Sequence, residues 1–402
     1  MSLETYAAAS ESQLTQQFIH RTPSKVDWCM DRRQARIYPS GSAVYSSTGT
    51  KLLKFNISGD AWLDPYSVHL VGTWRNKTGT DMTLVNSAYS AFQRCVVRCG
   101  GVQIEDIQNY GRNYYMLNKL GPKAHMDDLS ITAGAPGETI AANSSKVMSF
   151  PMWTGLLSQH KAIPLKYTQL TLELELTDSS DEFATQDWDL TDCFLMCDMM
   201  TLDSTLQSAY ASHMLEEGKE LIISFPGYQS SSYAVTSGDW QINLARSVTR
   251  LKSLFLSFRK HDGKKSNSLQ YPSTNADAFQ AQVQIGAKNF PDSKITSTAE
   301  FWPRLMAACG NHTSVLATSA IDVSNGAYTG AEFIAGFSCE KVLSESGETN
   351  MSGLNTKSGD LITVRTFGVT AGTTGNQVAE GFVCIVHDSI LAISDEGCRI
   401  FT

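Results

Sequence analysis

Two glutamates, Glu173 and Glu175, have the spacing of a carboxylate pair that could hydrolyse a sugar linkage. Enzymes of that class hold two carboxyl groups about 5–9.5 Å apart across a cleft. Residues i and i+2 on one strand face lie roughly 6.6–6.8 Å apart, so distance alone does not dismiss the pair. Their setting argues against it, because both form the polar face of one amphipathic segment. We interpret them as solvated or interface surface.

Other catalytic motifs are absent from the sequence. It contains no HExxH, no GxSxG and no phosphate-binding GxxxxGK[ST]. The glycine-rich run at 368–375 does not match GxGxxG, and it lies between two expected strands with no helix behind it, so we interpret it as a hairpin loop. We therefore predict no catalytic residues, no cofactor site and no enzymatic activity.

The spacing of histidines and cysteines predicts no metal site. No two of the eight histidines stand at i,i+2 or i,i+4. Cys95 and Cys99, like Cys193 and Cys197, are four apart, but in a strand four residues span roughly 13 Å, too far to chelate one ion. We interpret them as buried free thiols. The sequence starts without a secretory signal, so we expect synthesis in a reducing compartment.

The composition indicates hidden surface rather than a charged ligand. Charged residues make up 18% of the chain, where about 25% is usual, and the net charge is −8. Burial against neighbouring subunits explains a low charge. The basic segment 259–265 contains Asp-Gly and follows a strand-like run, so we interpret it as an exposed turn. We expect no direct sequence-specific nucleic-acid binding, which needs many phosphate-neutralising cations.

The elements that carry these residues are mostly strands. Leu170 to Thr177 alternates leucine with threonine or glutamate without a fault, which is the pattern of a strand with one buried face. Similar runs predict further strands at 51–57, 67–74, 92–98 and 193–202, and, from about residue 220 onward, at 241–244, 251–258, 279–285, 333–337, 361–367 and 382–393.

Three helices are expected among the strands. One covers Ile104 to Leu120 and ends at Gly121-Pro122. A second covers Ser297 to Cys309, with Thr298 as its cap and Pro303 tolerated near its first turn. A connecting helix covers Asp203 to Gly218, with Asp203 or Ser204 as cap and Leu206, Tyr210 and Met214 on one stripe.

The second half of the sequence repeats the first. Four aromatic anchors recur at offsets of 184–188 residues: Trp74 and Phe258, Phe92 and Phe279, Tyr114 and Phe301, and Phe194 and Phe382. A repeat of about 190 residues is a duplicated domain rather than a solenoid unit. We predict an arm at 1–22, a first β unit at 23–202, the connecting helix at 203–219 and a second β unit at 220–402. The strand–turn rhythm favours antiparallel sandwiches or barrels.

One segment resembles a known family. From Val147 to Leu176 the sequence runs Gly155-Leu156-Leu157, then Ile163-Pro164-Leu165, then the leucine/glutamate strand. This pattern is similar to the late first barrel of double-jelly-roll major capsid proteins, closest in style to virophage, Polinton-like and adintovirus-like members of the adenovirus–tailless phage lineage. The resemblance implies an all-β fold of two tandem eight-stranded antiparallel jelly-roll barrels with a few inserted and connecting helices.

The resemblance also implies a structural role in a virion. Three copies around an axis would place six barrels in a pseudo-hexagonal capsomer that tiles an icosahedral shell. The implied partners are the chain itself as a homotrimer, neighbouring capsomers, penton and minor capsid proteins and, as a further contact, an internal membrane. Synthesis would take place in the host cytoplasm or nucleus, and the arm at 1–22 would touch neighbours beneath the capsomer.

Two alternatives stay open at this point. A tandem β-sandwich carbohydrate-binding or attachment protein would expose aromatic residues at loop tips, and the candidates are Trp28, Trp62, Trp153, Trp188 and Trp240. Each of these also stands beside a strand-like run, which favours core or interface packing. A β-sandwich carbohydrate-active enzyme would depend on Glu173 and Glu175.

Overall fold

The fold is known from a computed structural model of the 402-residue chain. It describes residues 29–177, 182–215, 219–236, 238–244, 247–261, 267–275, 278–310, 319–321, 326, 328–341, 352–356, 361–372, 377–394 and 397–402. The predicted arm at 1–22, Trp28, Gly218 and most of the basic segment 259–265 lie outside the described residues.

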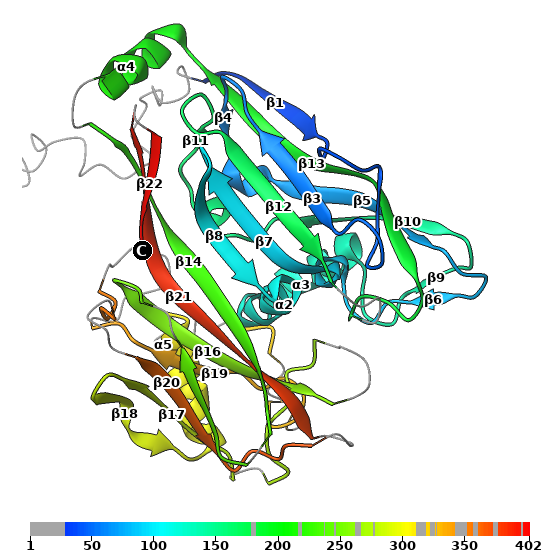
Figure 1. Ribbon diagram of the computed structural model, residues 1–402, viewed down its shortest axis with the longest axis vertical. Helices are drawn as coiled ribbons and strands as arrows, with labels where there is room; N and C mark the ends of the chain where they lie inside the picture. The colour runs from blue at the N-terminus through cyan, green and yellow to red at the C-terminus, as the bar shows by residue number, and fades with distance from the viewer. Residues whose placement is uncertain are drawn as a thin grey trace, which may run out of the picture.

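The first half forms two antiparallel sheets packed face to face (Figure 1). One sheet has the order β3-β12-β7-β8, formed by Leu52–Ile57, Leu170–Leu176, Phe92–Cys99 and Val102–Gln108. The other places β1, β13, β5 and β10 side by side, formed by Cys29–Ile37, Trp188–Leu202, His69–Asn76 and Ser145–Pro151. Short strands extend its edges: β2 at Val44–Tyr45, β4 at Trp62–Leu63 and β11 at Ile163–Pro164.

The second half repeats this arrangement. Its sheets have the orders β15-β20-β17-β18 and β14-β21-β16-β19. The strands of the first are Trp240–Leu244, Ile362–Phe367, Gln280–Ile285 and Lys288–Ile295, and those of the second are Leu221–Ala234, Val378–Ser394, Leu251–Lys260 and Ala335–Ser338. A further strand, β22 at Gly397–Phe401, pairs with β21. The predicted pair of eight-stranded antiparallel jelly rolls is confirmed.

The repeated anchors fall on equivalent elements. Trp74 is on β5 and Phe258 on β16, which hold the same place in their sheets. Phe92 opens β7 and Phe279 directly precedes the equivalent β17. Phe194 and Phe382 lie on β13 and β21, the central strands. Tyr114 and Phe301 lie on helices inserted at the same point of each roll. The sequence repeat is therefore a repeat of structure.

The alternation of β12 explains how one roll closes. Its four leucines are buried, while Thr171, Glu173 and Glu175 are half-buried on the other face. The leucines point to the opposite sheet and join a core that contains Trp74, Phe55 and Phe150. A strand side-chain period of two is what allows one face of the sheet to be wholly apolar. Burying each leucine contributes roughly 1.5–3 kcal/mol.

The inserted helices differ from the predicted ones. The segment Ile104 to Leu120 is a strand followed by a helix, because β8 extends to Gln108 and α2 covers Tyr110–Leu120. The helical spacing that predicted this segment begins at Tyr110 and belongs to α2, while the residues before it pair with β7, with a β-bulge at Ile104. A second helix, α3 at Lys123–Ala133, follows, so the first roll carries two midway helices rather than one.

The other helices follow the prediction closely. Helix α5 covers Thr298–Ala308 and continues through Pro303, which stands in its second turn. Its cap is Ser297 rather than Thr298, because the Ser297 hydroxyl accepts the Glu300 N–H. Helix α4 covers Ser204–Leu215 and is capped by Asp203, whose carboxylate accepts the Thr205 N–H at 2.8 Å. Among the described residues no helix is both long and apolar enough to cross a membrane.

The glycine-rich run at 368–375, of which 373–375 lie outside the described residues, is not a hairpin loop. It connects β20 to β21, which belong to different sheets of the second roll, so the chain crosses between the sheets there. Gly368 adopts φ +71°, and a Cβ at this position would come 2.1 Å from the Ala278 carbonyl oxygen. Glycine is needed there for the backbone conformation and the close approach, not for a phosphate.

Candidate assembly site

The two rolls meet through helix α2 of the first roll. Arg112 of α2 is buried and donates to the Ser268 carbonyl at 3.1 Å and the Ser257 hydroxyl at 3.3 Å. Its guanidinium lies over the ring of Phe382, 4.0 Å from the centroid. Burial lowers the pKa of Arg112 to about 9. This buried cation of the first roll therefore contacts three segments of the second roll, namely β16, the loop after it and β21.

Two further contacts reinforce this junction. Lys119, near the end of α2, forms an ion pair with Glu332 at 2.6 Å, and both side chains are largely buried. Asn267 of the second roll donates its side-chain amide to the Ser90 hydroxyl at 2.6 Å and its backbone N–H to Asn86 at 3.0 Å. The junction is therefore polar around the loop that follows β16.

A second part of the junction, between Trp153 and β14, is aromatic and tightly packed. Trp153 of the first roll contacts Tyr228 on β14, with ring centroids 4.6 Å apart. A Cβ on Gly155 would come 1.7 Å from the Pro226 carbonyl oxygen. This contact needs a residue without a side chain, because the backbones of the two rolls almost touch there.

Glu105 is a buried carboxyl beside that contact. Its two oxygens accept the backbone N–H groups of Gly155 at 2.9 Å and Leu156 at 3.0 Å. Burial raises the pKa of Glu105 to about 7, and these two hydrogen bonds partly oppose the shift. The carboxyl holds the short 3-10 turn Leu156–Ser158 against β8. The Gly155-Leu156-Leu157 motif of the sequence is thus part of the roll junction.

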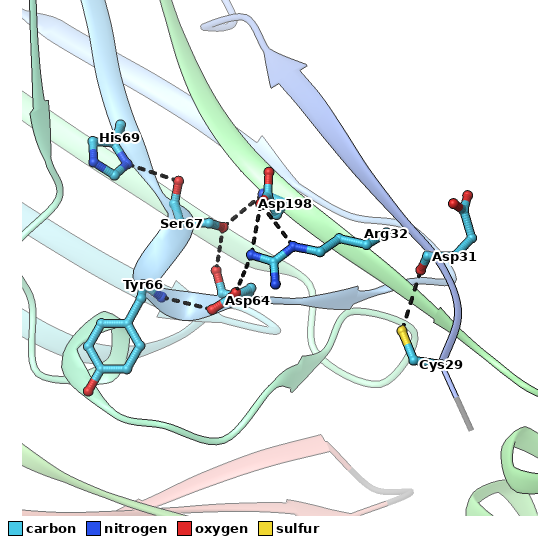
Figure 2. A network of polar contacts seen from close by, with 8 residues as sticks. All are labelled: Cys29, Asp31, Arg32, Asp64, Tyr66, Ser67, His69 and Asp198. Atoms are coloured by element: carbon cyan, nitrogen blue, oxygen red, sulfur yellow. Dashed lines mark hydrogen bonds and ion pairs between the residues drawn. The ribbon is translucent and has the colours of Figure 1, made fainter. Parts of the chain in front are cut away.

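A polar network ties β1 to its own roll on the far side of the molecule. Figure 2 shows Arg32 of β1 reaching Asp198 of β13 and Asp64. Its guanidinium donates to Asp198 at 3.0 and 2.8 Å and to Asp64 at 2.8 Å. Asp64 also accepts the Tyr66 N–H at 3.3 Å and the Ser67 hydroxyl on its carbonyl at 2.7 Å. The network anchors an edge strand that is exposed along most of its length.

Apolar side chains are exposed at several edges of the two rolls. Met30 lies on β1, Tyr38 directly follows it and Val44 lies on β2, while Val147 stands on β10 at the other edge of the same sheet. Others lie on the second roll, namely Ile222, Leu361 and Phe401. Edge strands also present unpaired backbone N–H and C=O groups, which can pair with another chain.

Glu173 and Glu175 lie on the outer face of β12 among cations. Glu173 stands between Lys54 of β3 at 3.4 Å and Arg98 of β7 at 3.5 Å. Arg94 of β7 lies opposite Glu175 and binds Asp106 with two hydrogen bonds of 2.8 and 2.7 Å. The charges alternate across the sheet in the manner of stabilising cross-strand pairs. The interpretation of the two glutamates as sheet surface fits this arrangement.

The candidate tryptophans occupy cores and contacts between elements. Trp188 and Trp240 are buried, one in each roll, and Trp153 lies in the junction. Trp62 packs on Tyr210 of α4 with centroids 4.8 Å apart. None of these four lies at a loop tip. The carbohydrate-binding alternative gains no support from them.

The predicted cysteine pairs are buried free thiols, as expected. Cys95 and Cys99 lie on β7, and Cys193 and Cys197 on β13. No group of three or more histidine, cysteine or acidic side chains is gathered as a metal site in the part of the chain that the structure describes. Sequence reasoning missed the junction residues Arg112 and Glu105, because a lone charge in a periodic segment carries no signal of burial.

Neither a protein-family model nor a curated protein matches the sequence. Solved structures match over nearly the whole chain. PBCV-1 VP54, in a crystal structure fitted into a reconstruction of the virophage Sputnik, has a TM-score of 0.67 at 11% identity and covers 92% of this chain and 96% of its own. The Faustovirus major capsid protein has a TM-score of 0.63 at 8% identity, with 98% and 96% covered. The Sputnik virophage structure has a TM-score of 0.59 at 12% identity and covers 98% of this chain and 92% of its own.

These neighbours agree with the strand order described above. The likeness covers 92–98% of this chain and therefore spans both rolls. At 8–12% identity it is a likeness of fold, not of sequence. The predicted resemblance to double-jelly-roll major capsid proteins is confirmed at that level.

Proposed function

We propose that this chain is the major capsid subunit of an icosahedral virus. The observation that carries the proposal is the pairing of two rolls with one strand order, in a chain that matches capsid proteins over at least 92% of its length. Its place is the virion, and its role is structural rather than enzymatic.

The subunit acts as a homotrimer. Two similar rolls side by side, repeated three times around an axis, give six similar edges, and such a pseudo-hexagon tiles a closed shell with neighbouring capsomers. The junction at Arg112 and Gly155 supports this, because a hexagonal outline requires a constant angle between the rolls. The exposed apolar residues at the edges of β1 and β10 supply surface for obligate contacts, which often bury more than ~2,000 Å².

The remaining partners follow from the shell. Penton and minor capsid proteins close its vertices and seams, and an internal membrane is a further surface for the capsomer base. The segment 1–22 serves as the arm that touches neighbours, the units at 23–202 and 220–402 are the two rolls, and 203–219 connects them. Synthesis in a reducing compartment, the host cytoplasm or nucleus, agrees with buried free cysteines.

The test is the mass and outline of the purified chain. Size-exclusion chromatography with light scattering is expected to give about 132 kDa, three times the 44.0 kDa chain. Negative-stain images of that species are expected to show a hexagonal outline. A monomer at micromolar concentration, or a trimer without six-fold outline, would overturn the proposal.

A matched variant locates the contact. Val147 to Asp on exposed β10 is expected to leave the monomer folded and to remove the trimer, if that edge is buried between subunits. The same change at Ile131, exposed on helix α3 outside the sheets, is the control for a charge placed on an apolar surface residue.

A further inference from the structure

A polar cavity of about 120 Å³ lies between the two rolls. Both rolls line it, the first with Gln93, Asn109 and Arg112 and the second with Ser232, Arg259 and Glu380. Gln93 and Ser232 are exposed, so solvent and small ions can reach this space. A cavity of this size has room for several water molecules or for one small polyatomic ion.

Arg112 is the buried cation of the cavity. The residue is 6% exposed, and its Nη2 donates to the Ser257 hydroxyl and the Ser268 carbonyl, both of which are neutral. Its Nε and Nη1 are buried without a hydrogen-bond partner among the described residues. The ring of Phe382 attracts the charge but does not replace two acceptors. Unsatisfied donors on a buried charge are costly, so an acceptor is expected in the cavity.

The N-terminus of helix α2 borders the same cavity. Asn109 and Gly111, on either side of the first helical residue, both line it. Asn109 holds the cap position with φ 51°, and its side chain does not cap the helix. The first N–H groups of an α-helix have no partner within the helix, and the helix dipole adds partial positive charge at this end. Both features favour a bound anion.

The remaining charges of the cavity are arranged around a single ring. Arg259 forms an ion pair with Glu380, and its guanidinium lies 5.5 Å from the centroid of Phe382. Glu182 also lines the cavity and would oppose an anion. Arg112 is the most deeply buried of these four charged residues. The attraction of an anion to Arg112 is therefore the least screened by water.

We propose that this cavity binds a small oxyanion, which accepts hydrogen bonds from Nε and Nη1 of Arg112 and from the N-terminus of α2. Phosphate, sulfate and a carboxylate share the required chemistry, because each can present two oxygens to the planar guanidinium. Since residues of both rolls line the cavity, the bound ion stabilises the docked pair of rolls. This inference rests on the cavity and does not depend on the proposed function.

The test is isothermal titration calorimetry of the full chain with sodium phosphate in Tris–chloride buffer, with sodium chloride at equal ionic strength as the reference. We expect one phosphate to bind per chain and chloride to give no saturable heat. Saturating phosphate is also expected to raise the melting temperature by about 2–5 °C. Sodium sulfate and sodium acetate are titrated in the same way, to distinguish a tetrahedral oxyanion from a carboxylate.

Arg112 variants test the site directly. R112M removes the charge and the donors, and R112K keeps the charge but loses the fork of N–H groups. Each is expected to weaken phosphate binding at least about tenfold. The matched control is R36M, because Arg36 also lies over a phenylalanine ring, Phe194, at 4.9 Å, but on the exposed strand β1. R36M is expected to bind as the wild type does. General stabilisation by salt is common to all variants, so the differences between them report the site.

A fourth variant is expected to act in the opposite direction. E380Q removes a neighbouring carboxylate and releases Arg259, and it is expected to lower the Kd for phosphate about tenfold.

The proposal is overturned if the wild type shows no saturable binding of phosphate, sulfate or acetate beyond chloride, or if R112K binds as tightly as the wild type. If R112M yields no folded protein, R112K and E380Q decide, and weaker binding in E380Q would also overturn the proposal. Saturable binding of acetate alone would support the site with a carboxylate as its ligand.

Discussion

The two rolls have the same strand order and differ in how far their strands extend. In the first roll, β1 has nine residues and is exposed along most of its length. Its counterpart β14 has fourteen, and the central strand β21 has seventeen where β13 has fifteen. The extra length carries Ile223, Phe225 and Leu391 into the core cluster of the first roll. Duplication explains the shared framework, and unequal strand length explains how one copy docks on the other.

The aromatic residues around the inserted helices also have a shared geometry and one difference between the rolls. Tyr114 of α2 lies against Phe150, with ring centroids 6.0 Å apart and planes at 82°. Phe301 of α5 lies against Phe333 in the same way, at 5.4 Å and 85°. The first roll adds a hydroxyl, which donates to the Pro151 carbonyl at 3.0 Å. The edge-to-face geometry is retained, while the polar contact belongs to the first roll's helix.

The largest expected effect is the loss of both rolls together. Leu172 on β12 and Val364 on β20 hold equivalent buried positions, opposite Val97 and Val283 respectively. Changing either residue to Asp buries an unpaired charge at a cost of several kcal/mol. The whole free energy of unfolding of a protein domain is only about 5–15 kcal/mol. Leu172 and Val364 belong to different core clusters, but strands of the second roll complete the cluster of the first. We therefore expect both variants to yield no soluble protein.

A control and a contrary outcome sharpen this prediction. Thr171 to Asp, on the opposite face of β12, is expected to express normally. Soluble Val364 to Asp protein with a native first roll, seen as retained near-ultraviolet circular dichroism, would show that the rolls are independent folding units.

The second prediction concerns the junction alone. Gly155 to Ala places a methyl group against the Pro226 carbonyl, where a Cβ has 1.7 Å of space. The backbone of Gly155 is right-handed helical, so alanine is not strained by its conformation. We expect a loss of about 3 kcal/mol or more in urea denaturation, and separate unfolding of the rolls. Gly79 to Ala, at an open position, is the control; an equal loss there would contradict the role of the junction.

The third prediction concerns pH and Glu105. Below pH 4.5 this carboxyl is protonated in both states, and between 4.5 and about 7 the folded protein keeps the proton that the unfolded chain releases. Stability therefore falls as the pH rises through this window, by up to about 3 kcal/mol.

The measurement compares stability–pH curves from urea denaturation. Glu105 to Gln removes the titrating group. The variant's stability is therefore expected to lack the fall of up to about 3 kcal/mol between pH 4.5 and 7, whatever its overall stability relative to the wild type. Glu175 to Gln, on the surface of β12, is expected to leave the slope unchanged. Parallel curves for the wild type and the Glu105 variant would show that Glu105 does not contribute to the pH dependence of stability.

The substitution with the smallest expected effect makes the first roll resemble the second. Tyr114 to Phe removes the hydroxyl that binds the Pro151 carbonyl and keeps the ring contacts. The expected loss is about 1 kcal/mol, measured as a lower urea midpoint with an unchanged slope. No loss would mean that the hydroxyl is dispensable and that the two aromatic centres are interchangeable.

Several elements were predictable from the sequence because their signal is local. The unbroken alternation of Leu170 to Leu176 defines a strand face whatever it packs against, and the capped run of α5 defines a helix. The four repeated anchors indicated the duplication because each pair marks the same strand or helix in both copies, and three of the four pairs are core residues of their own roll. Local periodicity and spacing therefore determined the fold class, the two units and the absence of recognisable catalytic motifs.

Only the tertiary structure decided which distant strands became neighbours. Strand β1 has no alternating pattern and exists because β13 supplies hydrogen-bond partners for it. The burial of Arg112 and Glu105 depends on the docking of one roll on the other. A side chain's periodicity is set within a few residues, but its burial and partners are set by chain segments hundreds of residues away.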